Sequence, residues 1–230
     1  MKNLHQAITE YSKQLLDSTN DWYNWREINE EKLPGGISLP AGNQYKKNVA
    51  LKNQLHREWV NADIEKRFAL TKYYIADWGG IHTNSPDSLF EYSTKSASYL
   101  IKNGKKGIAS WSKAIVLHDP NKYAIFDARV AISLNCLQVL NNVENKKIYP
   151  ILSSRNKIVA AGNKYIRDKA SAERWIKADD SMFYKEYLNL LKATAEEINS
   201  NVSTIEMLLF AKAEELVQEV IPDYTLPINA

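Results

Sequence analysis

The chain has one cysteine and little net charge, and it lacks the motifs of several common protein classes. Cys136 alone excludes an internal disulfide and a four-cysteine iron–sulfur cluster. Thirty basic residues against 27 acidic ones leave a net charge of +3, so nucleic-acid binding would require the basic residues to be clustered. No Cys/His set has zinc spacing, and neither a nucleotide-binding glycine loop nor a serine elbow occurs. We therefore expect no metal and no cofactor.

Long apolar runs and extended alternating patterns are also missing. No stretch reaches the apolar length that spans a bilayer, and the first residues show no apolar signal core. These absences predict a cytoplasmic protein without membrane contact. Alternation never exceeds four or five residues and no repeat occurs, which favours an all-α fold. A chain of 230 residues with 44% apolar content is long enough for one sizeable core or for two closely packed helical lobes, and we expect a single monomeric unit over 1–230.

Helical periodicity and end signals cover most of the chain. Ser85, Pro86 and Gly104 predict the cap, first position and end of one helix. Residues from Ser203 to Glu206 predict a capping box for the last helix. Together with apolar spacing, such signals predict helices at 3–18, 20–33, 55–76, 85–103, 127–140, 155–169, within 172–199, and at 203–220.

The most informative segment runs from residue 107 to residue 130. It reads as a glycine turn, an apolar helix, an Asp-Pro-Asn break, three apolar residues, and then Asp127 at the start of another helix. A carboxylate in that position caps free backbone N–H groups and gains from the helix dipole, so a purely structural N-cap is one interpretation. The order of turn, helix, break, carboxylate and helix supports a second interpretation, in which Asp127 has a functional role.

That order resembles the helix-hairpin-helix DNA glycosylase superfamily over about residues 90–140. The hairpin is Gly104–Ser110, and Ala124–Val130 occupies the position of the superfamily's catalytic Asp segment. Ala109 stands where a second hairpin glycine is usual. Lys113 lies a turn later than the lysine of bifunctional members, 14 residues before Asp127. The single cysteine excludes the branch of the superfamily that carries an iron–sulfur cluster.

The resemblance implies a glycosylase-like all-α fold of two closely packed helical lobes, and it assigns roles to individual residues. Asp127 would stabilise the cationic sugar formed on base loss. Lys113 would be a Schiff-base nucleophile that adds AP-lyase activity, or a structural or phosphate-binding residue. Lysines 95, 102, 105, 106 and 113 form either a phosphate-binding cluster or a solvated face. The residues expected to bind DNA are Gly104, Lys105, Lys106, Gly107, Ala109, Ser110 and Arg129.

A glycosylase acts on a base that has been flipped out of the duplex, and it holds that base by stacking and hydrogen bonds. The residues expected to form its pocket are Trp78, His82, Asn84 and Trp111. The expected partner is double-stranded DNA carrying a damaged or modified base. The Trp-Gly-Gly and Phe-Asp-Ala-Arg segments also resemble small bacterial anti-phage proteins, which implies glucosylated hydroxymethylcytosine as a target. Two alternatives remain open: a non-catalytic helix-hairpin-helix DNA-binding module, and an all-α interaction protein.

Overall fold

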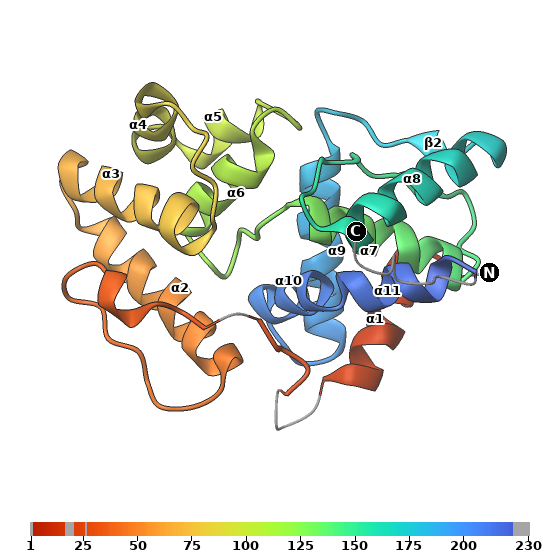
Figure 1. The fold of residues 1–230 in the computed structure, drawn as a ribbon, viewed down its shortest axis with the longest axis horizontal. Helices are drawn as coiled ribbons and strands as arrows, with labels where there is room; N and C mark the ends of the chain where they lie inside the picture. The colour runs from red at the N-terminus through yellow and green to blue at the C-terminus, as the bar shows by residue number, and fades with distance from the viewer. Residues whose placement is uncertain (1, 17–20, 26, 223–230) are drawn as a thin grey trace.

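The computed structural model describes residues 2–16, 21–25 and 27–222, and helices make up most of this part of the chain (Figure 1). The all-α prediction is therefore confirmed. The strands in the described residues are β1 (Lys147–Ile148) and β2 (Ile176–Lys177), which pair in parallel and carry two residues each.

One group of helices, here called the first lobe, holds the hairpin. Its elements are η1 (Glu30–Lys32), α2 (Gln44–Val60), α3 (Ile64–Lys72), the π-helical turn η2 (Tyr73–Trp78), α4 (Pro86–Thr94), α5 (Ala97–Ile101) and α6 (Ile108–Val116). Helix α3 packs on α2, η2 and α4, and α6 packs on α4, α5 and η2. Figure 1 shows these elements on the left, in orange to yellow-green.

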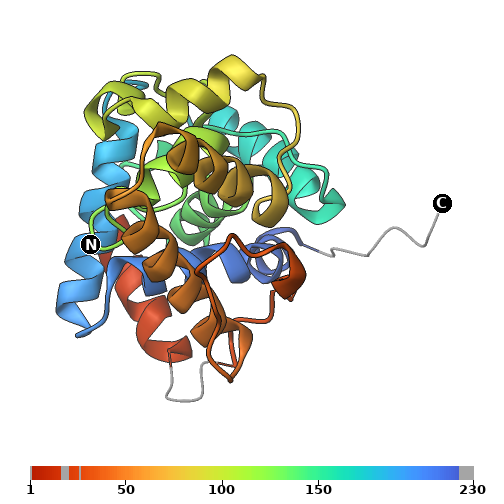
Figure 2. The same ribbon diagram turned by 90° about the vertical axis from the view of Figure 1, so that its left-hand side faces the viewer.

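The remaining helices, here called the second lobe, surround α7. They are α1 (Leu4–Leu15), α7 (Ala128–Leu140), α8 (Lys157–Ala172), α9 (Phe183–Glu197), α10 (Val202–Ala211) and α11 (Ala213–Val220). Helix α7 contacts α1, α8, α10 and α11, and its buried residues include Val130, Leu134 and Leu137. Figure 2, seen from the side of the first lobe, shows α2 and α3 in front of this group.

An apolar core joins the lobes, and a smaller one lies within the first lobe. The larger one runs from α7–α11 into α4–α6, where the indole of Trp111 meets the ring of Tyr184 edge to face at 4.8 Å. The smaller core lies under α2 and α3 and includes Leu51, Leu55 and Leu117. The larger core is therefore continuous across both helix groups.

Several predicted boundaries are wrong. The helix expected over 55–76 is interrupted after Val60, because the Asp63 side chain accepts from Lys66 N and starts α3. Ser96 similarly divides the helix expected over 85–103 into α4 and α5. Only one short 3-10 turn, η1, occurs in the described part of 20–33. Residues 17–18 and residues 20 and 26 of the first two predicted helices lie outside the described residues.

The capping box expected at Ser203–Glu206 is also wrong. The N-cap of α10 is Asn201, whose side chain accepts from Thr204 N at 2.9 Å. Glu206 is instead buried in an ion pair with Lys52 of α2. The predicted final helix is moreover divided at Lys212 into α10 and α11.

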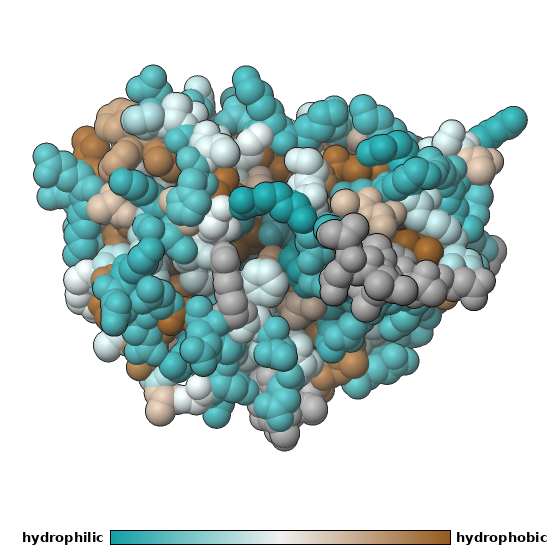
Figure 3. Space-filling view, in the orientation of Figure 1, coloured by the Kyte–Doolittle hydropathy of each residue, from teal (hydrophilic) through white to brown (hydrophobic). Residues whose placement is uncertain are grey.

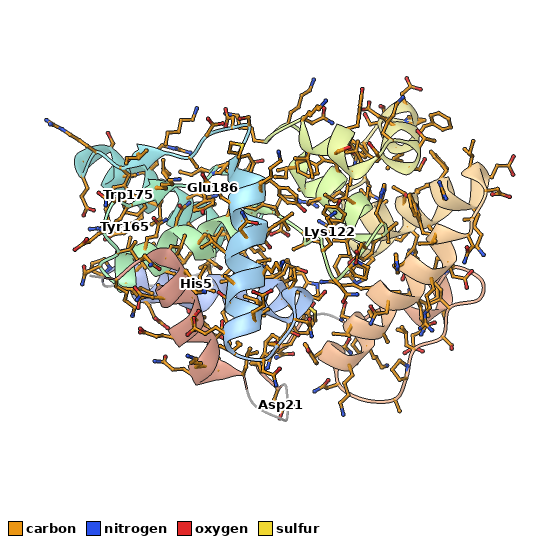
Figure 4. All side chains as sticks on the ribbon, turned by 180° about the vertical axis from the view of Figure 1, so that it is seen from behind. His5, Asp21, Lys122, Tyr165, Trp175 and Glu186 are labelled. Atoms are coloured by element: carbon orange, nitrogen blue, oxygen red, sulfur yellow. The ribbon has the colours of Figure 1, made fainter. Side chains whose placement is uncertain are left out.

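The connection from α6 to α7 carries the chain from the first lobe to the second. Figure 4 shows its Lys122 between the two helix groups, with His5 of α1 and Glu186 of α9 on the second lobe. The face drawn in Figure 3 is mostly hydrophilic and is hollowed near its middle, between the lobes. Within the described residues, none of the helices combines the length and apolarity needed to cross a membrane.

Candidate active site

A cavity of about 540 Å³ lies between the two lobes, and Asp127 and Lys113 both line it. The other lining residues come from both lobes and from the segment before η1. They are Tyr23, Trp25, Lys52, Trp78, Gly79, Ile81, Ala109, Ile125, Ala128, Arg129, Ser153, Ser154, Arg155, Asn156, Glu206, Met207 and Phe210.

Asp127 is the N-cap of α7, as its sequence context predicts. Its carboxylate accepts hydrogen bonds from Arg129 N at 2.9 Å and Val130 N at 3.1 Å. Because the first backbone N–H groups of a helix carry partial positive charge, this position stabilises the carboxylate's negative charge. The side chain is half-buried and lies at the cavity wall, so the cap also presents an anion to the cavity.

The apolar segment before Asp127 is fixed by side chains from other elements. Ser112 Oγ accepts from Phe126 N at 3.0 Å, Tyr184 donates to Ala124 O at 2.7 Å, and Tyr187 donates to Ile125 O at 2.8 Å. Burial raises the pKa of both tyrosines well above the usual value, so their hydroxyls remain protonated donors. Three buried hydrogen bonds thus hold the backbone that positions the carboxylate.

Lys113 enters the cavity from α6. Its side chain is only 4% exposed, and Nζ donates to Ala109 O at 2.8 Å. The lysine stem passes Gly79, where a Cβ would lie 2.7 Å from Lys113 Cε and 2.6 Å from Ile75 O. Gly79 directly follows the π-helical turn η2, an irregularity that often occurs at functional sites. The glycine therefore makes room for the lysine.

The segment predicted as the hairpin forms a turn between α5 and α6 as far as Gly107, and its residues 108–110 already belong to α6. Gly104 and Gly107 adopt φ values of 55° and 67°, and Gly107 is the N-cap of α6. The side chains of Lys105 and Lys106 are exposed, and Lys105 Nζ lies 3.5 Å from an Asp180 oxygen. These four predicted DNA-binding residues share one surface turn.

The other predicted DNA-binding residues lie elsewhere. Ala109 lines the cavity rather than the outer turn, and Ser110 is buried, accepting from Asn84 Nδ2 at 3.0 Å. Arg129 lines the cavity but is also bound to α10 and α11. Its Nε donates to Phe210 O at 2.9 Å, and its NH1 lies 2.6 Å from a Glu214 oxygen. Arg129 is therefore positioned to shape the wall of the cavity.

Of the four residues predicted for the base pocket, only Trp78 lines the cavity. Its ring stacks on Tyr74 with the centroids 4.5 Å apart. Trp111 is fully buried, and its Nε1 donates to Lys106 O at 3.1 Å, so it supports the hairpin from inside. His82 is exposed outside the cavity, and Asn84 is bonded to Ser110.

Sequence reasoning missed the cavity's aromatic and charged walls. Tyr23 and Trp25 come from a segment predicted to be a regular helix, and the Arg129 guanidinium lies 4.9 Å from the Trp25 ring. Lys52 and Glu206 come from opposite lobes, and their pairing has no local sequence signal.

Among the described residues, no three His, Cys, Asp or Glu side chains are grouped as a metal site requires.

Comparisons of the chain with protein-family models, curated proteins and solved structures find no match. The functional assignment therefore depends on the residues and geometry of this chain.

Proposed function

We propose that this protein is a DNA glycosylase that extrudes a modified or damaged base into the cavity and cleaves its N-glycosidic bond, which leaves an abasic site. The observation that carries the proposal is that a helix-start carboxylate, Asp127, and a buried lysine, Lys113, line one cavity. The hairpin turn leads directly into α6, the helix that carries Lys113. A purely structural N-cap requires none of these neighbours.

Asp127 supplies the negative charge. Base departure leaves a cationic sugar, and a preorganised carboxylate stabilises that cation without any rearrangement of water at the moment of reaction. The two backbone N–H groups that bind the carboxylate also fix its orientation. Asp127 can then direct a water molecule or an amine toward C1′ of the sugar.

Lys113 is the candidate amine. Attack of its neutral Nζ on C1′ forms a C–N bond as the base leaves with the glycosidic electron pair, and loss of the amine proton with ring opening gives a Schiff base. Such an intermediate leads to strand cleavage, which is AP-lyase chemistry. The contact between Nζ and Ala109 O holds the amine at the cavity wall. If water attacks instead, Lys113 has an electrostatic or structural role.

The hairpin is the proposed phosphate anchor. Gly107, at positive φ, is the N-cap of α6, and a helix N-terminus favours anions. Lys105 and Lys106 add exposed positive charge to the same turn. Contacts of this kind fix the position of the duplex without reading its sequence.

The size of the cavity supports a modified base as substrate. A volume of about 540 Å³ falls within the range of about 300–1,000 Å³ that is typical of small-molecule pockets. Aromatic side chains from Tyr23, Trp25 and Trp78 provide surfaces on which a base can stack. A bulky phage-type cytosine such as glucosylated hydroxymethylcytosine is compatible with this space, and so is a damaged base.

The proposal is tested by incubating the protein with duplexes that carry damaged and phage-type bases and scoring abasic sites. We expect abasic product from at least one modified duplex and none from unmodified DNA. DNA binding without abasic product would instead indicate a non-catalytic DNA-binding module. Neither binding nor product would indicate an interaction protein in which Asp127 serves only as a helix cap.

A further inference from the structure

A buried ion pair forms part of the wall of the cavity, and the glycosylase chemistry described above gives it no role. Lys52 lies on α2 and Glu206 on α10, and each side chain is only 3% exposed. Lys52 Nζ contacts the Glu206 carboxylate and also donates to Ser203 Oγ at 3.1 Å. The pair therefore joins the two lobes, and both of its residues line the cavity beside Asp127.

Joining the lobes is not a sufficient reason for charged side chains at this position. Removing two charges from water is costly, and apolar residues of similar volume often stabilise a fold as well as a buried ion pair does. Here both side chains border a cavity rather than solid packing. A polar ligand in that cavity would offer the remaining donors of the ammonium and the remaining lone pairs of the carboxylate additional hydrogen bonds.

The pair shares its surroundings with the proposed catalytic groups. Burial raises the pKa of Glu206, the positive charge of Lys52 opposes that increase, and the negative charge of Asp127 adds to it. A ligand that donates an N–H to Glu206 would relieve part of this unfavourable burial.

The other cavity walls are suited to the flat faces of a base. Trp78 stacks on Tyr74, and the Trp25 ring meets the Phe210 ring edge to face at 4.6 Å. Aromatic walls of this kind hold a planar ligand without distinguishing one base from another. Discrimination then requires polar groups at the edge of the base, and Lys52 and Glu206 are charged residues that line the same cavity.

We infer that Lys52 and Glu206 bind the hydrogen-bonding edge of the extruded base and determine which bases are excised. Lys52 Nζ donates to a ring nitrogen or carbonyl oxygen, and the Glu206 carboxylate accepts from the neighbouring amino or imino N–H. The substrate class is therefore a modified base that presents an acceptor beside an N–H donor on its edge. This inference rests on the proposed glycosylase function.

The test compares matched substrates and matched variants. Duplexes carry glucosylated hydroxymethylcytosine, its counterpart that lacks the exocyclic amine and so the N–H donor beside the ring acceptor N3, or 8-oxoguanine as a further modified base. Lys52→Met combined with Glu206→Leu replaces the ion pair with apolar groups of similar size. The control combines Lys147→Met with Glu186→Leu, which removes a pair 3.0 Å apart that does not line this cavity. Single-turnover base release is measured for every combination, together with the thermal midpoint.

The parent protein should favour the complete base over its amine-lacking counterpart by about 10- to 100-fold, as a base-edge contact does. The Lys52→Met, Glu206→Leu variant should fold with an unchanged or higher thermal midpoint, while its preference falls to within about threefold. The control variant should keep the preference of the parent. If the Lys52→Met, Glu206→Leu variant fails to fold, Lys52→Leu combined with Glu206→Met, which also removes both charges and keeps an unbranched side chain at position 206, should show the loss of preference.

Three results overturn the inference. A folded double variant that keeps the parent preference would make the pair a structural link only. A double variant whose rate falls by the same factor on the complete base and on the amine-lacking base would indicate a general effect on the cavity. A parent protein that releases no base from any modified duplex would overturn the glycosylase function itself, and that result is seen without any variant.

Discussion

Replacing Gly79 with alanine tests whether the cavity wall positions Lys113. An added Cβ would lie 2.6 Å from Ile75 O, 2.9 Å from Tyr74 O and 2.7 Å from Lys113 Cε. Two of these atoms belong to the backbone of η2, so either that turn or the lysine must move. Overpacking of this kind costs about 1–3 kcal/mol of stability. A displacement of about 1 Å in a reacting group lowers a rate by about 100-fold.

The assay measures unfolding by urea, base release in a single turnover, and borohydride trapping of the protein–DNA adduct. Gly35→Ala is the matched control, because no heavy atom lies within 4 Å of its added Cβ. Gly79→Ala should lose stability, base release and trapping, whereas Gly35→Ala should keep all three. A Gly79→Ala protein with the stability and base-release rate of the parent would refute the reasoning. A Gly79→Ala protein that is less stable but releases the base at the parent rate would show that the position of Lys113 does not limit catalysis.

Three further predictions concern the nucleophile, the DNA anchor and the half-buried His118. If Lys113 attacks the sugar, borohydride should trap a covalent adduct with the parent protein, and Lys113→Gln should abolish trapping. Lys105→Ala combined with Lys106→Ala should flatten the slope of log affinity against log salt by up to about two, equally for all DNA sequences. Burial and the charge of Arg67 lower the pKa of His118 to about 4. Because the unfolded chain then binds more protons, stability should fall as the pH decreases from about 6.5 to 4, and His118→Phe should remove up to about 3 kcal/mol of that dependence in urea titrations.

Each of these predictions has a contrary result. Abasic product without any trapped adduct would make water the nucleophile and assign Lys113 another role. Equal slopes of log affinity against log salt for the parent and the double lysine variant would place the DNA-binding surface away from the hairpin. An unchanged dependence of stability on pH in His118→Phe would assign the acid sensitivity to other groups.

Local signals in the sequence predicted the elements that depend on neighbouring residues. Asp127 follows an apolar segment and precedes helical spacing, and it caps α7. Gly104 and Gly107 mark the turn between α5 and α6, and both have positive φ. Caps and glycine turns are decided within a few residues, so one sequence is enough to find them.

The missed features depend on contacts between distant segments. Ser203 and Glu206 have the spacing of a capping box, but Lys52, more than 150 residues earlier, pairs with the glutamate. A buried partner on another helix therefore overrode the local motif, and Asn201 became the cap. Trp111 and Trp78 likewise look equivalent as sequence, yet one is buried in the larger core and the other lines the cavity. Their difference arises from tertiary packing alone.

The substitution Asp127→Asn tests the central claim most directly. The amide oxygen can still accept from Arg129 N and Val130 N, so the cap and the fold should survive while the negative charge is lost. Asp63→Asn, the same change at the cap of α3 outside the cavity, is the control. We expect Asp127→Asn to slow single-turnover base release by about 1,000-fold or more at unchanged DNA affinity, and the control to match the parent. Base release by Asp127→Asn within a fewfold of the parent would contradict the catalytic role of Asp127.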